Sequence, residues 1–379
     1  MSSKTRILMA DDSVTVRRML TDTLASDPDI EVCAIARDGK EALIRFPMIK
    51  PDVVVLDVEM PVMDGIEAVI AIRKIDSRVP IIMFSSLTMK GGQATFDALS
   101  YGATDYVTKP TKSGNMQEAV AHIRRELVPR IKQLGQRSSD VRSAAVRSFN
   151  SSFSLQRGVV GTLPQESPIS FATNSSFAAD RFDVLAIGAS TGGPNALAEV
   201  LKPLSKDFSI PILIAQHMPA MFTSLLAERL TQNSSLKVRE ATDGVLMEPG
   251  QVWVAPGDHH LVIEKQGFRS ILRLNREAPE NSCRPSVDVL FRSVAAAFRD
   301  RALAVVLTGM GCDGQKGCEH IRYVGGKVIA QDEATSVVWG MPGAVAKAGL
   351  ANCVLPLTDI SKQLSRLQQP GRLMSTAGH

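Results

Sequence analysis

An apolar run, a glycine-rich turn and the start of a helical pattern follow one another in Phe182-Asp-Val-Leu-Ala-Ile-Gly-Ala-Ser-Thr-Gly-Gly-Pro194. The apolar run predicts a buried β-strand. The residues 188–192 match G-x-S-x-G, a pattern typical of the sharp strand-to-helix turn that exposes a nucleophilic serine. Ser190 is therefore the candidate nucleophile. The turn is equally compatible with phosphate binding, although the third glycine of G-x-G-x-x-G is absent.

Short apolar runs alternate with helical patterns on both sides of this stretch, which predicts an α/β fold of two doubly wound domains. A polar stretch without a sustained period separates the two sets, so we expect domains at 1–135 and 181–372 and a flexible linker at 136–180. Gly267 lies between two closely spaced runs, which suggests an antiparallel hairpin inside a mostly parallel sheet. The apolar runs are 6–10, 30–35, 53–56, 81–84, 105–108, 182–187, 210–215, 252–255, 260–263, 271–274, 302–307 and 327–330.

The composition excludes several classes of protein. Of the 379 residues, 44% are hydrophobic and 22% are charged, which excludes a collagen-like or a mostly disordered acidic chain. The net charge of +4 is too weak a field to indicate a nucleic-acid partner. No apolar stretch reaches the roughly 18 residues that a membrane-spanning helix requires. The five scattered cysteines favour a reduced protein, so we expect a cytoplasmic location without membrane insertion.

Carboxylates gather at predicted strand ends in the first domain. Asp11 and Asp12 follow the first predicted strand, and Asp57 ends the third. Such ends meet at one edge of a parallel sheet, where three carboxylates repel one another unless a cation such as Mg²⁺ joins them. Lys109 and Ser85 follow two further strands and supply the positioning groups of phosphoryl transfer. One aspartate alone would be a solvated surface group, but the five placements together indicate a phosphoryl-transfer site.

A nucleophilic serine needs a base and a group that orients the base. His217 stands at the end of the strand predicted at 210–215, in the same kind of position as Ser190. Asp313 comes just past another apolar strand, in a glycine-rich loop. We therefore predict that Ser190, His217 and Asp313 converge at one edge of the sheet. The alternative for Asp313 is a helix N-cap, a role that could coexist with catalysis.

The first domain resembles the receiver domain of two-component response regulators, a flavodoxin-like fold. The resemblance implies that Asp57 accepts a phosphoryl group from a chemotaxis histidine kinase of the CheA type. Ser85 and Tyr106 occupy the switch positions, and Lys109 completes the phosphoryl site. The implied Mg²⁺ ligands are Asp11, Asp12, Asp57 and the backbone carbonyl of Glu59.

The second domain resembles the catalytic domain of chemotaxis protein-glutamate methylesterases, the CheB family. The resemblance implies a phosphorylation-regulated carboxylic ester hydrolase that demethylates glutamate methyl esters of chemoreceptors, releases methanol and also deamidates glutamines, for chemotaxis adaptation. It implies no cofactor for the ester chemistry. The stretches that carry it are Ile187-Gly-Ala-Ser-Thr-Gly-Gly-Pro194, Ala215-Gln-His-Met-Pro219, Ala255-Pro-Gly-Asp-His-His260, and the residues 284–293, 307–314 and 331–344.

The same resemblance assigns roles to individual residues. Ser190 attacks the ester, His217 takes its proton, and Asp313 holds the imidazolium. The amides of Met310 and Thr191 stabilise the oxyanion. The substrate lies on a helix surface, so we expect an open cleft, with Arg284, Trp339 and Met341 as candidate lining residues. For Trp339 and Met341, packing in the core is an equal alternative.

Two other functions remain open from the sequence. One is a general serine esterase with a receiver attached, which would hydrolyse small esters but release no methanol from methylated receptors. The other is a phosphorylation-dependent binding module or transcription factor. No basic recognition helix stands out to support the latter, and it would leave the predicted Ser-His-Asp constellation without a purpose.

Overall fold

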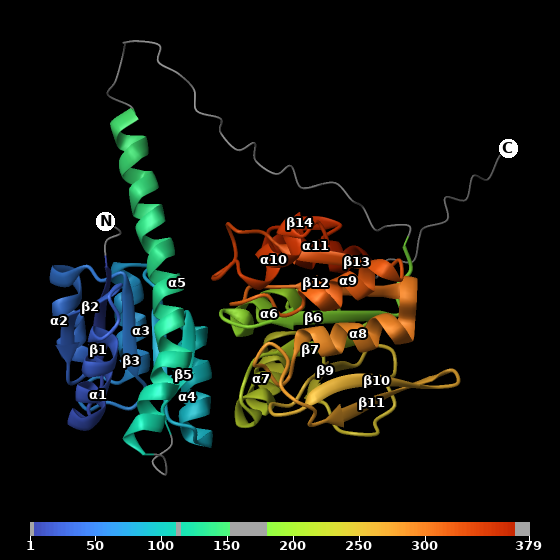
Figure 1. The fold of residues 1–379 in the computed structure, drawn as a ribbon, viewed down its shortest axis with the longest axis horizontal. Helices are drawn as coiled ribbons and strands as arrows, with labels where there is room; N and C mark the ends of the chain where they lie inside the picture. The colour runs from blue at the N-terminus through green and yellow to red at the C-terminus, as the bar shows by residue number, and fades with distance from the viewer. Residues whose placement is uncertain (1–3, 111–114, 152–179, 368–379) are drawn as a thin grey trace. The chain divides into compact units, whose positions relative to one another are not determined.

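The structure is a computed structural model that describes residues 4–110, 115–151 and 180–367. The chain divides into two compact units, residues 1–171 and 172–379, whose described elements are labelled along the chain in Figure 1. Within the described ranges, no helix has both the length and the apolar character needed to cross a lipid bilayer.

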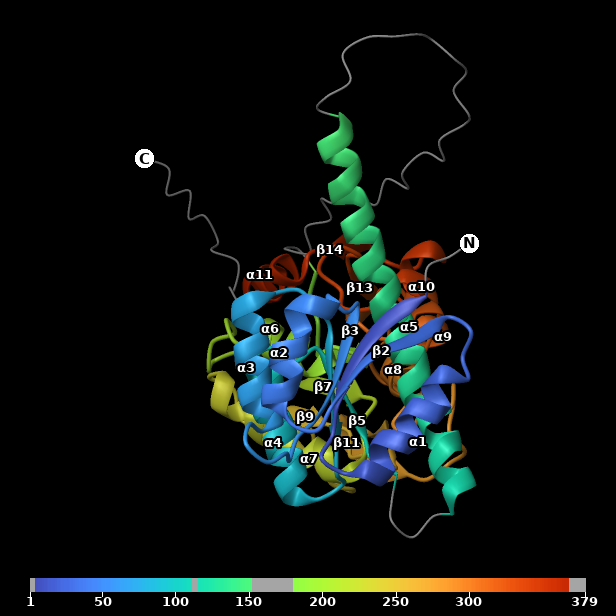
Figure 2. The ribbon, with the colours of Figure 1, turned by 90° about the vertical axis from the view of Figure 1, so that its left-hand side faces the viewer.

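The first unit is a five-stranded sheet in the order β2-β1-β3-β4-β5, and every neighbouring pair is parallel. This confirms the predicted doubly wound fold. Helices α2, α3 and α4 lie on one side of the sheet, and α1 and α5 lie on the other (Figure 2). The elements are β1 (Thr5–Ala10), α1 (Val14–Ala25), β2 (Ile30–Ala36), α2 (Gly39–Ile49), β3 (Val53–Asp57), α3 (Gly65–Ile75), β4 (Ile81–Ser85), α4 (Met89–Ser100), β5 (Asp105–Thr108) and α5 (Met116–Ser151).

Helix α5 is longer than the sequence pattern predicts. It continues to Ser151, so the predicted start of the linker at residue 136 falls inside the helix. Residues 136–151 contain no proline or glycine, and helix propagation is cooperative once a helix has started. The remainder of the predicted linker, at 152–179, lies outside the described residues.

The second unit is a seven-stranded sheet in the order β14-β13-β12-β6-β7-β9-β8, and all its pairs are parallel. The elements are β6 (Val184–Ala189), α6 (Gly193–Leu201), β7 (Ile212–Gln216), α7 (Ala220–Asn233), β8 (Val238–Glu240), β9 (Val252–Val254), β10 (His260–Gln266), β11 (Arg269–Asn275), α8 (Val287–Phe298), the 3₁₀ turn Arg299–Arg301, β12 (Ala302–Val306), α9 (Gln315–Tyr323), β13 (Lys327–Gln331), α10 (Met341–Lys347), β14 (Cys353–Leu355) and α11 (Leu357–Leu367).

The predicted hairpin exists, but its expected place in the sheet is wrong. Strands β10 and β11 pair antiparallel with each other and form a separate two-stranded sheet. The neighbouring run, β9, belongs instead to the parallel sheet, where it pairs with β7 and β8. The hairpin leaves the main sheet and packs against α8.

The centre of the seven-stranded sheet determines where chemistry can occur. Strand β6 lies between β7 and β12, so the chain winds outward from β6 in both directions. Ligands of doubly wound sheets bind beyond the carboxyl ends of the strands at such a reversal point. The residues that follow β6, β7 and β12 meet there.

Candidate active site

The turn after β6 presents Ser190. Its amide donates to Thr308 O at 3.0 Å, and its carbonyl accepts from Gly193 N at 2.8 Å. Gly192 has φ +75°, a left-handed conformation that a glycine adopts without strain. At Gly193, a Cβ would come within 1.9 Å of Gln216 Oε1. The two glycines therefore permit a tight elbow that leaves the serine 7% exposed.

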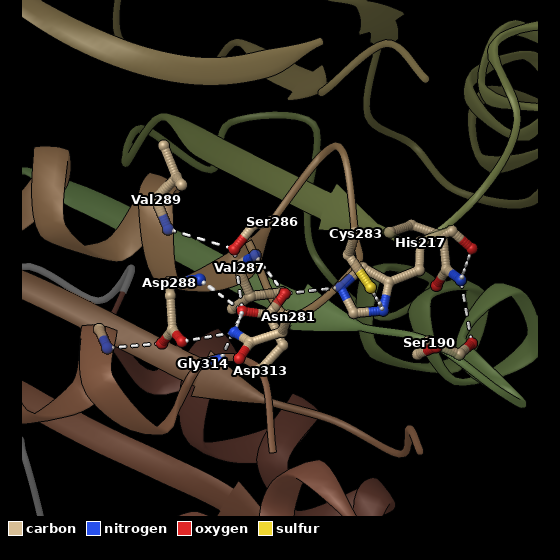
Figure 3. Close-up of polar contacts among 12 residues, drawn as sticks. Ser190, His217, Asn281, Cys283, Ser286, Val287, Asp288, Val289, Asp313 and Gly314 are labelled. Atoms are coloured by element: carbon tan, nitrogen blue, oxygen red, sulfur yellow. Dashed lines mark hydrogen bonds and ion pairs between the residues drawn. The ribbon is translucent and has the colours of Figure 1, made fainter. Parts of the chain in front are cut away.

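The parallel register brings His217 next to this elbow. Ala189 pairs with Gln216, and His217 N donates to Ala189 O at 3.2 Å. The buried amide of Gln216 joins the two candidate positions, because its Nε2 donates to Ser190 O at 2.9 Å and to His217 O at 3.2 Å. Figure 3 shows the serine and the histidine side by side with these two bonds.

Asp313 binds the imidazole directly and is held from every other side. Its Oδ2 lies 2.7 Å from His217 Nε2. The carboxylate also accepts bonds from the amino end of α8, where Ser286 is the N-cap. Besides the histidine, Val287 N donates to Oδ2. Four further groups donate to Oδ1: Asn281 Nδ2, Ser286 Oγ, Asp288 N and Gly314 N.

These bonds shift both pKa values in the direction of an ion pair. Burial alone would raise the pKa of Asp313, but the bonds from His217 and from the α8 amides outweigh burial and hold the pKa well below its usual range. Burial would likewise lower the pKa of His217, yet the contacts with Asp313 and Cys283 raise it above the ordinary value of 6.5. The carboxylate therefore stays ionised and stabilises the imidazolium.

The pairing also determines which ring nitrogen can act as the base. Because Nε2 donates to Asp313, Nδ1 is the nitrogen left to accept a proton from Ser190. Among the described residues, no hydrogen bond joins the Ser190 hydroxyl to the imidazole. Catalytic hydrogen bonds are commonly long in enzymes without substrate and tighten in the substrate complex.

Two backbone amides fit an oxyanion-binding role. Among the described residues, the N–H groups of Thr191 and Met310 have no hydrogen-bond acceptor. Thr191 directly follows the nucleophile, and Met310 follows Gly309, whose Cβ, if present, would lie 2.8 Å from the Cβ of Ser190. Amides directed at the position of a developing negative charge are the main source of its stabilisation.

The three candidate cleft residues have different environments. Met341 is completely buried and lies against Gly309, which is the core-packing alternative that the sequence left open. Trp339 is half-buried, and its Nε1 donates to Gln331 O at 2.9 Å. The guanidinium of Arg284 donates hydrogen bonds to the Asp258 carboxylate and to the backbone carbonyls of Arg276 and Glu277.

A second constellation lies in the first unit, at the carboxyl edge of β1 and β3. Lys109 Nζ lies 2.8 Å from Asp11 Oδ2 and 2.8 Å from Asp57 Oδ2. Oxygen atoms of Asp11, Asp12 and Asp57 lie within 4.8 Å of one another. Burial and the neighbouring Asp11 raise the pKa of Asp57 to about 6, although Lys109 opposes the shift. This excess of crowded negative charge fits a divalent cation with oxygen ligands.

The predicted switch residues lie on the two strands that follow β3 in the sheet, β4 and β5. Ser85 ends β4, is fully buried, and donates its hydroxyl to Gly91 O at 3.0 Å. Tyr106 is buried in β5, and burial raises the pKa of its phenol. The side chain of Glu59 forms a solvent-exposed ion pair with Lys90 at 2.9 Å. The metal-binding role predicted for Glu59 involves its backbone carbonyl and not this side chain.

Comparisons with known proteins identify both units. Residues 7–121 match the response regulator receiver domain, and residues 185–364 match CheB methylesterase. A protein-glutamate methylesterase/protein-glutamine glutaminase of Trichodesmium erythraeum (strain IMS101) is 42% identical over 96% of this chain and 99% of its own. The chain belongs to the CheB family. A relative with the same description from a Nocardioides species (strain ATCC BAA-499 / JS614) is 45% identical over 95% of this chain and 94% of its own.

Among solved structures, the catalytic domain of CheB methylesterase from Thermotoga maritima is similar. It is 42% identical, with a TM-score of 0.48, and the match covers 49% of this chain and 98% of that domain.

Three residues of this CheB-family site were not identified from the sequence. Gln216 precedes the histidine and joins the two elbows; its place in the quoted Ala-Gln-His-Met-Pro stretch was the available signal. Asn281 and Cys283 contact Asp313 and His217 from the loop between β11 and α8, and β11 lies outside the seven-stranded sheet whose strand ends were considered. The reasoning from strand ends could therefore not find them.

Proposed function

We propose that this chain is a phosphorylation-regulated hydrolase that removes methyl esters from glutamates of chemoreceptors and deamidates selected glutamines. The observation that carries the proposal is the 2.7 Å bond between His217 and Asp313, at the edge where Ser190 follows the central strand. Family membership supports the substrate class. A cytoplasmic location follows for the proposed reaction, because the phosphodonor kinase and the signalling helices of the receptors are expected there.

The chemistry proceeds in two halves. Ser190 Oγ attacks the ester carbonyl while His217 Nδ1 takes its proton, and the amides of Thr191 and Met310 receive the oxyanion. The imidazolium then protonates the departing methoxide, and methanol leaves an acyl-enzyme. Water, deprotonated by the same nitrogen, releases the glutamate and restores Ser190. With a glutamine substrate, the leaving group is ammonia.

The decisive experiment measures methanol released from receptor membranes methylated with a labelled methyl group. The full chain should release labelled methanol, and it should do so faster from receptors than from small esters compared at equal concentration. Turnover of small esters without release from receptors would instead support a general esterase and contradict the proposal.

For regulation, we propose that Asp57 is phosphorylated by a chemotaxis histidine kinase. Asp11, Asp12, Asp57 and the backbone carbonyl of Glu59 would hold Mg²⁺, which neutralises charge on the transferring phosphoryl group. Lys109, already bonded to two of the carboxylates, is positioned to contact a phosphoryl oxygen. Formation of the phosphoaspartate would draw the Ser85 hydroxyl from Gly91 O, because a dianionic acceptor binds a hydroxyl more strongly than a carbonyl does.

Replacement of the proposed phosphorylation site tests this switch. The variant Asp57→Asn should show no increase in methanol release on addition of a small-molecule phosphodonor with Mg²⁺, because an amide does not attack phosphorus. It should keep the rate of the unphosphorylated chain. Asp22→Asn, an exposed carboxylate on α1, is the matched control and should be activated like the wild type. Activation that survives in Asp57→Asn would refute the switch.

The rate should also depend on pH through the catalytic base. Only the neutral imidazole accepts a proton, and the contacts of His217 raise its pKa above 6.5. The value of kcat/KM should therefore be low in acid and rise as the pH passes through that raised pKa. A pH profile of kcat/KM, which reports the groups of the free enzyme, measures this limb. A rate that is already constant below pH 6 would contradict the assignment.

A further inference from the structure

A tight turn at Glu280–Cys283 lies against the triad. Glu280 N donates to Cys283 O at 3.2 Å, and Cys283 N donates to Glu280 O at 2.9 Å. Between them, Asn281 has φ +53° and Ser282 has φ +62°. Two central residues with positive φ define a type I′ turn, which favours Asn and Gly. Serine at the second position is a strained choice, and such strain persists where the surroundings hold the backbone.

The surroundings do hold this turn. The Glu280 carboxylate receives a two-point bond from Arg292 of α8, with Nη1–Oε1 2.7 Å and Nη2–Oε2 2.5 Å. The Asn281 amide donates to Asp313 Oδ1 at 2.9 Å and to Asp288 Oδ2 at 2.9 Å. One end of the turn is thus fixed to the same helix that holds the catalytic carboxylate.

The other end of the turn contacts the base. Cys283 Sγ lies 3.5 Å from His217 Nδ1, and Figure 3 shows the thiol next to the imidazole. Because Nε2 donates to Asp313, Nδ1 carries a lone pair in the neutral ring. The thiol is therefore the donor in this contact. The turn holds Asp313 through its second residue and His217 through its fourth.

We propose that Cys283 is a positioning residue for the catalytic base: its thiol holds the imidazole of His217, whose tautomer Asp313 sets, in the orientation in which Nδ1 accepts the proton of Ser190. A thiol suits this place because it is both a weak donor and a weak acceptor. It donates to the neutral ring, and once Ser190 has transferred its proton, the sulfur accepts from Nδ1–H. Because the S–H···Nδ1 hydrogen bond is weak, the Ser190 hydroxyl can replace it at a small cost in free energy.

The titratable groups that face His217 among the described residues are Asp313, on Nε2, and Cys283, on Nδ1. Both contacts favour the imidazolium, the second because the sulfur accepts more strongly from a charged Nδ1–H than the thiol donates to the neutral nitrogen. Removal of the sulfur should therefore affect two separate quantities, the orientation of the ring and its pKa. A residue that only filled space would affect neither.

The test compares Cys283→Ala and Cys283→Ser with the full wild-type chain in the methanol-release assay. For alanine, we expect the plateau kcat at high pH to fall about two- to tenfold, the range expected for one neutral hydrogen bond, with KM unchanged. The acid limb of the pH–rate profile should move to lower pH. Serine keeps a donor and should lie between alanine and the wild type. Cys312→Ser, which removes an exposed thiol, is the matched control and should superimpose on the wild type.

This inference rests on the proposed function, so a second readout is independent of turnover. Titration of the ¹⁵N-labelled imidazole of His217 by NMR reports its pKa and tautomer in the absence of substrate. The wild type should show Nε2 protonated and a higher pKa than Cys283→Ala. An unchanged pKa and an unchanged kcat in Cys283→Ala would overturn the inference. Wild-type protein with the expected titration but no methanol release would overturn the proposed function alone.

Discussion

The variant Ser190→Ala should release methanol about 10⁶-fold more slowly than the wild type, the loss in rate typical of removing the nucleophile of a serine triad. The expected effect is large because the histidine and the aspartate act only through the serine. The rate that remains comes from substrate binding and from the oxyanion-binding amides. Release of labelled methanol from methylated receptor membranes measures it, with KM determined separately to show that binding persists.

The fold of this variant should be unaffected. Alanine keeps the Cβ of Ser190, and the Ser190 hydroxyl makes no hydrogen bond with any described residue, so nothing is left unpaired. The matched control is Ser224→Ala, whose hydroxyl donates to Met221 O within α7, and its rate should equal that of the wild type. A Ser190→Ala protein with the wild-type melting temperature and an undiminished rate would eliminate the nucleophile.

The sequence predicted the central strands well because burial on both faces makes them apolar throughout. The run Val53-Val-Val-Leu56 is such a case, and all of β3 is buried. The sequence analysis did not predict β8 and β14, which have three residues each. These two strands form the two edges of the seven-stranded sheet. An edge strand this short is defined by the hydrogen bonds of its neighbour, which its own composition does not record.

The grouping of the proposed triad at one edge of the sheet was predictable for a related reason. Ser190, His217 and Asp313 each follow a strand, and adjacent parallel strands deliver their carboxyl ends to one edge. The sequence did not predict the turn at Glu280–Cys283 that contacts them. Asn281 and Ser282 adopt positive φ although neither is a glycine. No local sequence pattern predicts a type I′ turn at these residues. Its function depends on contacts with residues that are distant in the sequence.

Replacement of Asp313 by asparagine should lower kcat by about 10⁴-fold, because the change reverses the tautomer of the base. All of the contacts of the carboxylate come from donors: His217 and Val287 N at Oδ2, and four more at Oδ1. An asparagine must direct its NH₂ group at some of them. If the NH₂ faces His217, Nε2 becomes the acceptor and Nδ1 carries the proton, so it no longer accepts from Ser190. If it faces the α8 amides, the amino end of the helix loses its acceptor.

Either orientation leaves buried donors unpaired, and each costs about 1–3 kcal/mol of unfolding free energy. Loss of stability must therefore be separated from loss of chemistry. Asp288→Asn is the matched control: Asp288 is equally buried and accepts from Gly317 N and Asn281 Nδ2, but it does not touch the imidazole. Both variants should melt at lower temperature, and only Asp313→Asn should lose kcat by about 10⁴-fold at a temperature where both are folded. Equal losses of kcat in the two would show that Asp313 acts through the stability of the loop, and would remove it from the triad.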